Sequence, residues 1–203
     1  RTSMELGGNA PFIVFDDADI DAAVQGAMMS KYRNTGQTCV CANRLYVQDG
    51  VYDEFSAKLA QAASGMVVGD GLKGDTQQGP LINMAAVEKV EEHIEDAIAN
   101  GAKVISGGSR HDLGGTFFQP TVLAEVNTDM KVTKEETFGP VAPVISYRDE
   151  DDLIALANDT EYGLSTTIWT ENLSRAHRVA GKIDVGITWV NSWFLRDLRT
   201  PFG

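Results

Sequence analysis

The stretch PFIVFDDADIDAAVQGAMM, residues 11–29, indicates the fold class of this 203-residue chain. Residues 11–15 are all apolar or proline, which is typical of a short buried strand. Aspartates follow at positions 16, 17 and 19, where carboxylates cap a helix and favour its dipole. Apolar residues then recur at helical spacing, at Ile20, Ala23, Val24, Ala27 and Met28. A strand followed directly by a helix of this length predicts the first part of a βαβ unit.

The same alternation continues along the chain. We expect further strands at residues 44–47, 103–106, 141–147, 165–169 and 186–190, and extended chain at 117–126. We expect helices at residues 19–34, 52–63, 83–100, 150–158 and 172–182. Helix 83–100 carries the clearest apolar stripe, and Gly101 ends it. Strands separated by helices predict one α/β domain, in which helices cover both faces of a largely parallel sheet.

Charge and composition exclude several classes of function. The chain has 17 Lys and Arg against 29 Asp and Glu, a net charge of −12. A nucleic-acid partner would require a basic face, so we expect none. We also expect no membrane association, because no apolar run approaches the length that spans a bilayer. No secretory signal opens the sequence, but Arg1 is not a natural start, and we expect the chain to be part of a longer protein.

The two cysteines, Cys39 and Cys41, lie one residue apart. Metal sites usually space a ligand pair by two to four residues and need further ligands elsewhere. The three histidines are scattered and adjoin neither cysteine. We therefore expect no metal site. Two interpretations remain for the cysteines: inert core thiols, or a reactive pair in a reducing compartment.

Residues 69–74 match the G-x-G-x-x-G pattern of dinucleotide-binding folds. That pattern requires a strand before it and a helix that begins at its third glycine. Here a helix precedes it, and Pro80 prevents a helix from continuing after it. We expect a surface turn rather than a phosphate site.

Two other segments carry residues suited to catalysis. In residues 34–39 a predicted helix ends, Gly36 permits a tight turn, and Cys39 follows. This context suits a nucleophilic thiol with backbone donors nearby, although a buried structural cysteine is the alternative. In residues 4–9, Glu5 stands between apolar residues and before two glycines. An apolar surround raises a carboxyl pKa towards that of a general base, although Glu5 could instead pair with a neighbouring lysine or amide.

In order along the chain, Glu5–Leu6–Gly7–Gly8, Gly36–Gln37–Thr38–Cys39, residues 135–140 (EETFGP) and Pro201–Phe202–Gly203 resemble successive motifs of the aldehyde dehydrogenase superfamily. The resemblance covers the whole chain. It implies the three-layer, parallel-sheet catalytic domain of that family over residues 1–203. It also implies that the family's N-terminal cofactor-binding domain and C-terminal oligomerisation tail are absent.

The resemblance implies a role for each matched residue. Cys39 matches the nucleophile that forms a thiohemiacetal and then a thioester, and Glu5 matches the base that activates water for hydrolysis. Glu136 matches the carboxylate that holds the nicotinamide ribose, with Phe138 beside it, and Leu6 matches a backbone contact to the nicotinamide. The cofactor would be NAD or NADP, with most of its contacts in the absent domain. We therefore expect the isolated chain to bind it poorly and to be inactive as a dehydrogenase.

The substrate class also follows from resemblance. Residues 33–44, 8–19 and 46–53 resemble succinate-semialdehyde dehydrogenases, in which Arg33 would bind the remote carboxylate of the substrate. The alternative is that Arg33 pairs with a local aspartate. Cys41 would form a redox-switch disulfide with Cys39, or would simply be buried.

Residues 189–203 instead resemble 2-hydroxymuconic or 2-aminomuconic semialdehyde dehydrogenases. In this segment Arg196 is the first candidate to meet a substrate carboxylate and Arg199 the second. The chain is either a natural intermediate member or a splice of two relatives. Both resemblances imply a small aldehyde that carries a remote carboxylate.

Two other classes of function stay open: a different thiol enzyme that uses Cys39, and a non-catalytic assembly fragment. The first would need a histidine near the thiol, and none has a suggestive context. The family resemblance and the thiols lead us to expect a cytoplasmic location. Full-length relatives are expected to be homo-oligomers.

Overall fold

The computed structural model describes Met4, residues 6–197, Arg199 and Phe202. The strands are β1 (Ala10–Val14), β2 (Ala42–Gln48), β3 (Lys103–Ser106), β4 (Thr121–Ala124), β5 (Val141–Tyr147), β6 (Ser165–Trp169) and β7 (Ile187–Val190). The helices are α1 (Ile20–Tyr32), α2 (Tyr52–Ser64), α3 (Met84–Ala99), α4 (Lys131–Lys134), α5 (Glu150–Asn158) and α6 (Leu173–Ala180), with short 3-10 turns η1 (Arg33–Gly36) and η2 (Asp49–Val51).

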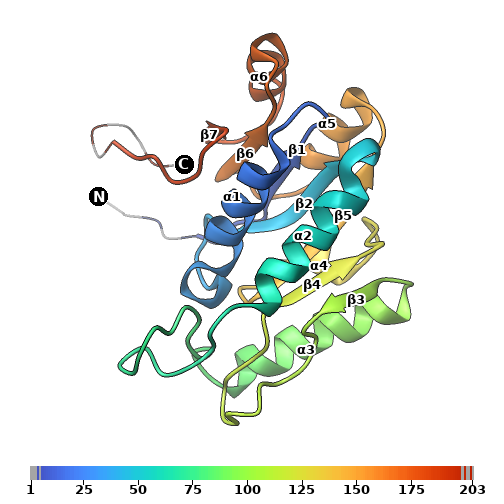
Figure 1. The fold of residues 1–203 in the computed structure, drawn as a ribbon. Coiled ribbons are helices and arrows are strands. Elements are labelled where there is room, and N and C mark those ends of the chain that lie inside the picture. The colour runs from blue at the N-terminus through green and yellow to red at the C-terminus, as the bar shows by residue number, and fades with distance from the viewer. Residues whose placement is uncertain (1–3, 5, 198, 200–201, 203) are drawn as a thin grey trace.

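The strands form one sheet, in the order β3-β4-β5-β2-β1-β6-β7 among the described residues (Figure 1). Every neighbouring pair is parallel except β3 and β4, which are antiparallel. The connection between β3 and β4 contains no helix, so the chain turns back instead of crossing over. Gly107 and Gly108, both at positive φ, begin that turn. The predicted, largely parallel α/β sheet is confirmed.

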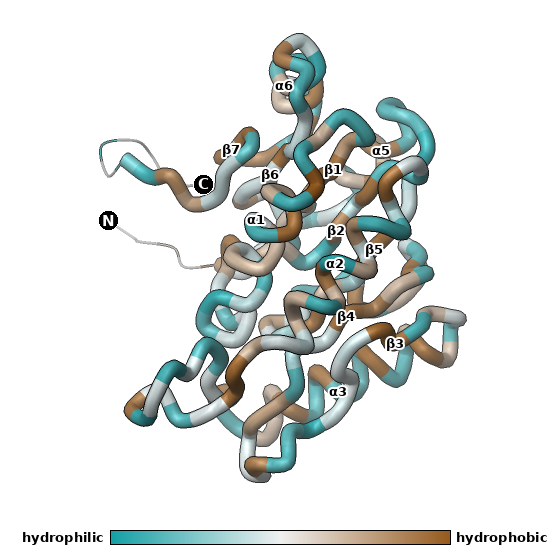
Figure 2. The backbone as a smooth tube through the Cα atoms, in the orientation of Figure 1, coloured by the Kyte–Doolittle hydropathy of each residue, from teal (hydrophilic) through white to brown (hydrophobic). Residues whose placement is uncertain are grey.

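Helices cover both faces of the sheet. Side chains of a strand alternate between these two faces, so neighbouring residues of one strand pack against different helices. Phe12 and Val14 of β1 pack with residues of α1 and α2. Ile13 and Phe15 pack on the other face, with residues of α3, α5 and α6. Figure 2 shows apolar chain along the sheet and hydrophilic stretches on the surrounding turns. The three-layer architecture is confirmed, and the central strand β1 is buried along its whole length.

Capping side chains set the helix starts. The Asp19 side chain accepts a hydrogen bond from the Ala22 N–H at 3.0 Å, as an N-cap does. The predicted helix over 19–34 ends at Tyr32 instead, because the chain enters the tight turn η1 there. The four-residue helix α4 was not predicted, since it is too short to show a periodic pattern.

The predicted surface turn at residues 69–74 is confirmed. Leu72 is 95% exposed, and Asp70 accepts a hydrogen bond from the Leu72 N–H. No helix in the described part of the chain is long and apolar enough to cross a membrane.

A buried arginine ties the starts of β1 and β2 to α5. Arg44 is 2% exposed, and its Nε donates to the carbonyl of Asn9 at 3.0 Å. Its guanidinium also donates to the carbonyls of Leu156 (3.1 Å) and Ala157 (3.0 Å), in the last turn of α5. Carbonyls at a helix C-terminus favour a cation. Arg44 thus stabilises the edge of the sheet at which the strands begin.

Candidate active site

The segments that carry Leu6, Cys39 and Glu136, together with a fourth segment that carries no predicted residue, all lead into parallel strands. Residues 6–9 precede β1, residues 36–41 precede β2, residues 136–140 precede β5 and residues 161–164 precede β6. Parallel strands begin at the same edge of a sheet, so these segments lie together. Ligands of open α/β sheets usually bind at the opposite edge, where the strands end.

Two glycines allow three of these segments to pack closely. A Cβ on Gly8 would lie 2.1 Å from the carbonyl oxygen of Cys39. A Cβ on Gly7 would lie 2.7 Å from Oε2 of Glu136. The segment that follows Glu5 in sequence is therefore packed between the loop of Cys39 and the carboxylate of Glu136, with no room for side chains.

The turn before Cys39 has consecutive left-handed residues. Asn34, Thr35 and Gly36 have φ of 50°, 60° and 74°. This conformation is unfavourable for the β-branched Thr35, whose hydroxyl is held by the carbonyl of Gly79 at 3.1 Å. A Cβ on Gly36 would lie 2.1 Å from the carbonyl oxygen of Gly139. The turn therefore rests directly on the segment that contains Glu136.

Gln37 anchors the same turn to a neighbouring loop. Its Nε2 donates to the carbonyl of Pro80 at 3.3 Å, and its Oε1 accepts from the N–H of Ile82 at 2.9 Å. Both contacts are long-range in sequence. These contacts hold the turn that precedes Cys39 in place without a ligand.

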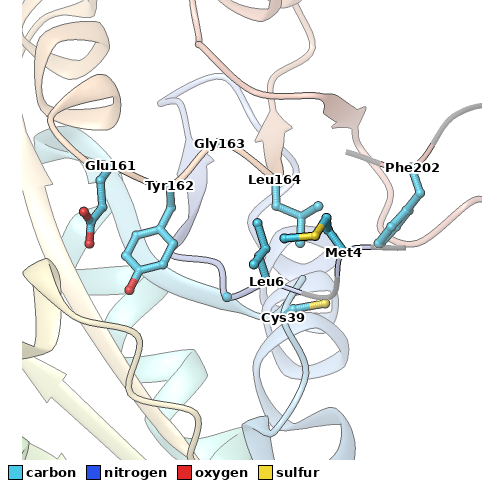
Figure 3. Close-up of a pocket in the computed structure, with 9 residues that line it drawn as sticks. Met4, Leu6, Cys39, Glu161, Tyr162, Gly163, Leu164 and Phe202 are labelled. Carbon is cyan, nitrogen blue, oxygen red and sulfur yellow. The ribbon is translucent and has the colours of Figure 1, made fainter. Parts of the chain in front are cut away.

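Cys39 lines a cavity of about 610 Å³. The lining residues are Met4, Leu6, Gly7, Cys39, Glu161, Tyr162, Gly163, Leu164 and Phe202. Figure 3 shows the Cys39 side chain beside Leu6 and Met4, with Phe202 on one side and Tyr162 on the other. Glu5 lies outside the described residues. Its sequence neighbours Met4 and Leu6 both line this cavity, so the described chain on either side of Glu5 borders the Cys39 thiol.

Glu136 is fixed by the backbone around it. Its Oε1 accepts a hydrogen bond from the Gly8 N–H at 3.0 Å, and its own carbonyl accepts from Nζ of Lys89 at 2.6 Å. Phe138 lies two residues further on, 38% exposed and with a positive φ of 52°. Strained backbone of this kind is concentrated at functional sites.

A buried lysine lies beneath the site. Lys31 is 0% exposed, and its Nζ donates to Oδ1 of Asn43 at 2.8 Å. Burial lowers the pKa of Lys31 to about 8, although the negative charges of Cys41 and Glu136 oppose that shift.

Cys41 is buried, whereas Cys39 is partly exposed, and both are present as thiols. Burial raises the pKa of the Cys41 thiol, and the charge of Lys31 opposes the rise. The Cys41 Sγ lies 3.9 Å from the carbonyl oxygen of Arg33. Cys41 is therefore a weakly acidic thiol in this conformation.

The two predicted substrate arginines lie beside aromatic rings. The exposed Arg33 has its guanidinium carbon 5.1 Å from the ring centroid of Phe194 and 6.0 Å from that of Trp193. Among the described residues no carboxylate forms a salt bridge with Arg33, so the alternative of a local aspartate partner gains no support there. Trp193 belongs to an apolar cluster against which Cys39 packs. Trp193 therefore lies between Arg33 and the loop that contains Cys39.

The C-terminal arginines differ from each other. The guanidinium carbon of Arg196 lies 4.4 Å from the ring centroid of Phe202, which lines the cavity of Cys39. Arg199 instead forms a salt bridge with Asp197. Arg196 is therefore the arginine of this segment that contacts the cavity wall.

Residues 1–203 match the model of the aldehyde dehydrogenase family. The chain belongs to this family. The resemblance predicted from the motifs is thus confirmed. The chain is 57% identical over 203 residues to the NADP(+) succinate-semialdehyde dehydrogenase of Escherichia coli (strain K12), a match that covers 100% of the chain and 42% of that protein. It is 56% identical, with the same coverage, to the glutarate-semialdehyde dehydrogenase of Pseudomonas aeruginosa.

The solved structures agree with these sequence matches. The crystal structure of succinate-semialdehyde dehydrogenase from Burkholderia pseudomallei superposes with a TM-score of 0.97 at 54% identity, covering 99% of this chain and 42% of that one. The present member of the aldehyde dehydrogenase family thus spans less than half the length of the relatives that it matches.

Several residues of this family member that contact the site were missed by the sequence analysis. Tyr162 and Leu164 line the cavity, and they stand just before a strand that was predicted from residue 165. Because parallel strands start at one edge, that position was a usable signal. Lys31 lies one turn after Ala27 in the apolar stripe of α1, so its burial was also foreseeable from helical spacing.

Proposed function

We propose that this chain is the catalytic domain of an NAD(P)-dependent aldehyde dehydrogenase whose substrate carries a remote carboxylate. The observation that carries this proposal is that Leu6, Gly7 and Cys39 line one cavity while Glu136 packs against Gly7 and Gly8. The chain spans about 42% of its curated relatives. We therefore propose that other parts of a longer protein supply most cofactor contacts and the elements for homo-oligomer assembly.

Cys39 would act as the nucleophile. Its sulfur adds to the aldehyde carbon and gives a thiohemiacetal, which becomes a thioester when hydride leaves. Glu5 would accept a proton from water, and the resulting hydroxide would hydrolyse the thioester to the carboxylic acid and the Cys39 thiol. The partly exposed Cys39 in a cavity that accommodates a small molecule supports this assignment.

The residues present fit an NAD(P) nicotinamide riboside. One oxygen of the Glu136 carboxylate accepts the Gly8 N–H, and a carboxylate retains acceptor capacity for a ribose hydroxyl. Phe138, two residues after Glu136, and Leu6, two residues before Gly8, both expose apolar surface. The bound oxidised nicotinamide would supply the acceptor for hydride. The chain's own contribution is to hold the ribose at Glu136 and the ring beside Leu6.

Arg33 and Arg196 would bind the substrate carboxylate. Each guanidinium lies over an aromatic ring that packs near Cys39 or lines its cavity. The names of the E. coli and P. aeruginosa relatives, which act on succinate semialdehyde and glutarate semialdehyde, support an ω-carboxylated aldehyde. A muconic-type semialdehyde is the alternative substrate, supported by the position of Arg196 against Phe202.

A chimera tests the reaction. Residues 1–203 of this chain replace the matching segment of the E. coli succinate-semialdehyde dehydrogenase, and NADPH production is followed with succinate semialdehyde. We expect activity that Cys39→Ala abolishes, together with a covalent Cys39 adduct in mass spectrometry when hydrolysis is blocked by Glu5→Gln. A folded chimera that forms neither product nor adduct would overturn the proposal. The isolated 203-residue chain is expected to produce negligible NADPH.

The same chimera tests the substrate assignment. Rates with succinate semialdehyde and 2-hydroxymuconic semialdehyde are compared for Arg33→Leu and Arg196→Leu, with the uncharged propanal as the matched control substrate. Loss of one guanidinium–carboxylate contact of about 1.5–3 kcal/mol would lower kcat/KM about 10- to 100-fold for the carboxylated aldehyde alone. Unchanged selectivity in both variants would refute the assignment.

A further inference from the structure

Lys31 occupies a position that packing alone would give to an apolar residue. It lies in the last turn of α1, one turn after the buried Ala27, and its side chain is 0% exposed. An ammonium group removed from water loses its hydration, which costs several kcal/mol unless polar groups replace it. The contacts of this ammonium group therefore indicate what it does.

A chain of hydrogen bonds leads from Lys31 to the candidate ribose carboxylate. Nζ of Lys31 donates to Oδ1 of Asn43 at 2.8 Å, and Nδ2 of Asn43 donates to the carbonyl of Gly8 at 3.1 Å. The N–H of Gly8 donates to Oε1 of Glu136 at 3.0 Å. The chain begins at a buried cation and ends at a carboxylate, and Gly8 is its central link.

The cation fixes the orientation of the Asn43 amide. An ammonium group only donates hydrogen bonds, so the amide oxygen must face Lys31 and the NH₂ must face the Gly8 carbonyl. Without the cation, the amide could rotate and place its oxygen against that carbonyl, where two acceptors repel. Lys31 therefore determines whether Asn43 holds the Gly8 backbone.

We propose that Lys31 is a positioning residue that acts through Asn43 to hold the Leu6–Gly8 segment against Glu136. This inference deepens the proposed function and rests on it. Because Gly7 and Gly8 contact Glu136 and the Cys39 carbonyl so closely, a small displacement of this segment shifts the surface that would meet the nicotinamide riboside. Lys31 is expected to affect cofactor binding more than the chemical step.

The test uses the active chimera with Lys31→Met, Asn43→Leu and the double variant. Lys182→Met is the matched control, because Lys182 is half-exposed, pairs with Asp151, and neither residue lines the Cys39 cavity. For the three test variants we expect KM for the cofactor to rise about tenfold, the equivalent of one charge-assisted hydrogen bond, with kcat within about threefold. The double variant should be no worse than either single variant, because both cut the same chain.

Hydrogen–deuterium exchange gives a second readout that does not depend on turnover. We expect the Gly8 amide to exchange about tenfold faster in Lys31→Met than in the parent, with exchange in α6 unchanged, if one hydrogen-bonded link is lost. A variant that lowers Tm yet keeps parental cofactor KM and Gly8 exchange would show Lys31 to be structural only, and so would additive effects in the double variant.

The outcomes separate this inference from the proposed function. An inactive parent chimera refutes the proposed function, whereas an active parent with unaffected Lys31 variants refutes the positioning role alone. If Lys31→Met does not fold, Asn43→Asp carries the same test, because a carboxylate still accepts from the Lys31 ammonium but cannot donate to the Gly8 carbonyl.

Discussion

Replacing Lys31 by methionine removes a buried charge and, with it, a pH dependence of stability. Burial lowers the pKa of this lysine from 10.5 to about 8 in the folded protein. Above about pH 8 the folded state has lost the Lys31 proton, whereas the unfolded state retains it up to about pH 10.5. The unfolded state therefore binds more protons in this window, so the contribution of Lys31 to stability rises with pH. A shift of about 2.5 pKa units at about 1.36 kcal/mol each corresponds to about 3 kcal/mol.

Urea denaturation between about pH 7 and pH 10 measures this contribution as a difference between variants. The comparison is best made in a Cys41→Ala background, because the Cys41 thiol is electrostatically coupled to Lys31. Tyr32 and Tyr147, whose pKa values are raised by burial, titrate alike in both proteins and cancel.

By about pH 10, the free energy of unfolding should have risen about 2 kcal/mol more in the protein that retains Lys31 than in the Lys31→Met variant. Lys182→Met should leave the rise unchanged. Parallel curves for the parent and the Lys31→Met variant would refute the reasoning, since a lysine that stays charged in both states contributes no slope.

Three further predictions concern other contacts. Gly8→Ala should lower kcat/KM of the chimera about 100-fold, because its Cβ would meet the Cys39 carbonyl at 2.1 Å and displace the loop of Cys39. Steady-state kinetics check this beside Gly50→Ala, whose Cβ would make only an ordinary contact with Asp16 at 3.9 Å, and near-parental activity of Gly8→Ala would contradict it. Arg44→Met should destabilise the chain by about 3 kcal/mol in thermal unfolding, because the carbonyls of Asn9, Leu156 and Ala157 lose the guanidinium that donates to them. An equal loss of stability in Arg148→Met, at a side chain that is 89% exposed, would show the effect to be nonspecific. Peroxide should inactivate the parent chimera reversibly and the Cys41→Ser chimera irreversibly. The measurement is the activity recovered with dithiothreitol, and equal recovery in the two proteins would exclude Cys41 as a redox partner.

The architecture was predictable because its signals are local and repeated. The strand at residues 11–15 and the helix after it are each encoded by adjacent apolar residues, and the structure has both within a few residues of the expected bounds. The antiparallel direction of β3 was not predicted. Periodicity shows where a strand lies, whereas its direction depends on whether the next connection crosses over or turns back.

The candidate site was predictable only where motifs supplied it. The segments of Cys39 and Glu136 were identified from family motifs, and the structure packs them together. Asn34 and Thr35, left-handed beside Gly36, were not foreseen, because neither residue type signals positive φ as strongly as glycine does. Tyr162 and Leu164 precede a predicted strand, which indicates their end of the sheet, but that this strand is the neighbour of β1 is known only from the assembled sheet.

The close packing of Gly7 and Gly8 has a consequence for how this enzyme architecture can diversify. A side chain at Gly8 would meet the Cys39 carbonyl and one at Gly7 would meet the Glu136 carboxylate, so we expect the distances among these three segments to vary little. Arg33 and Arg196, by contrast, are exposed and rest on aromatic rings, where exchange disturbs little of the core. Under the proposed function, we therefore expect substitutions of Arg33 and Arg196 to change the preferred aldehyde without moving the Cys39 and Glu136 segments.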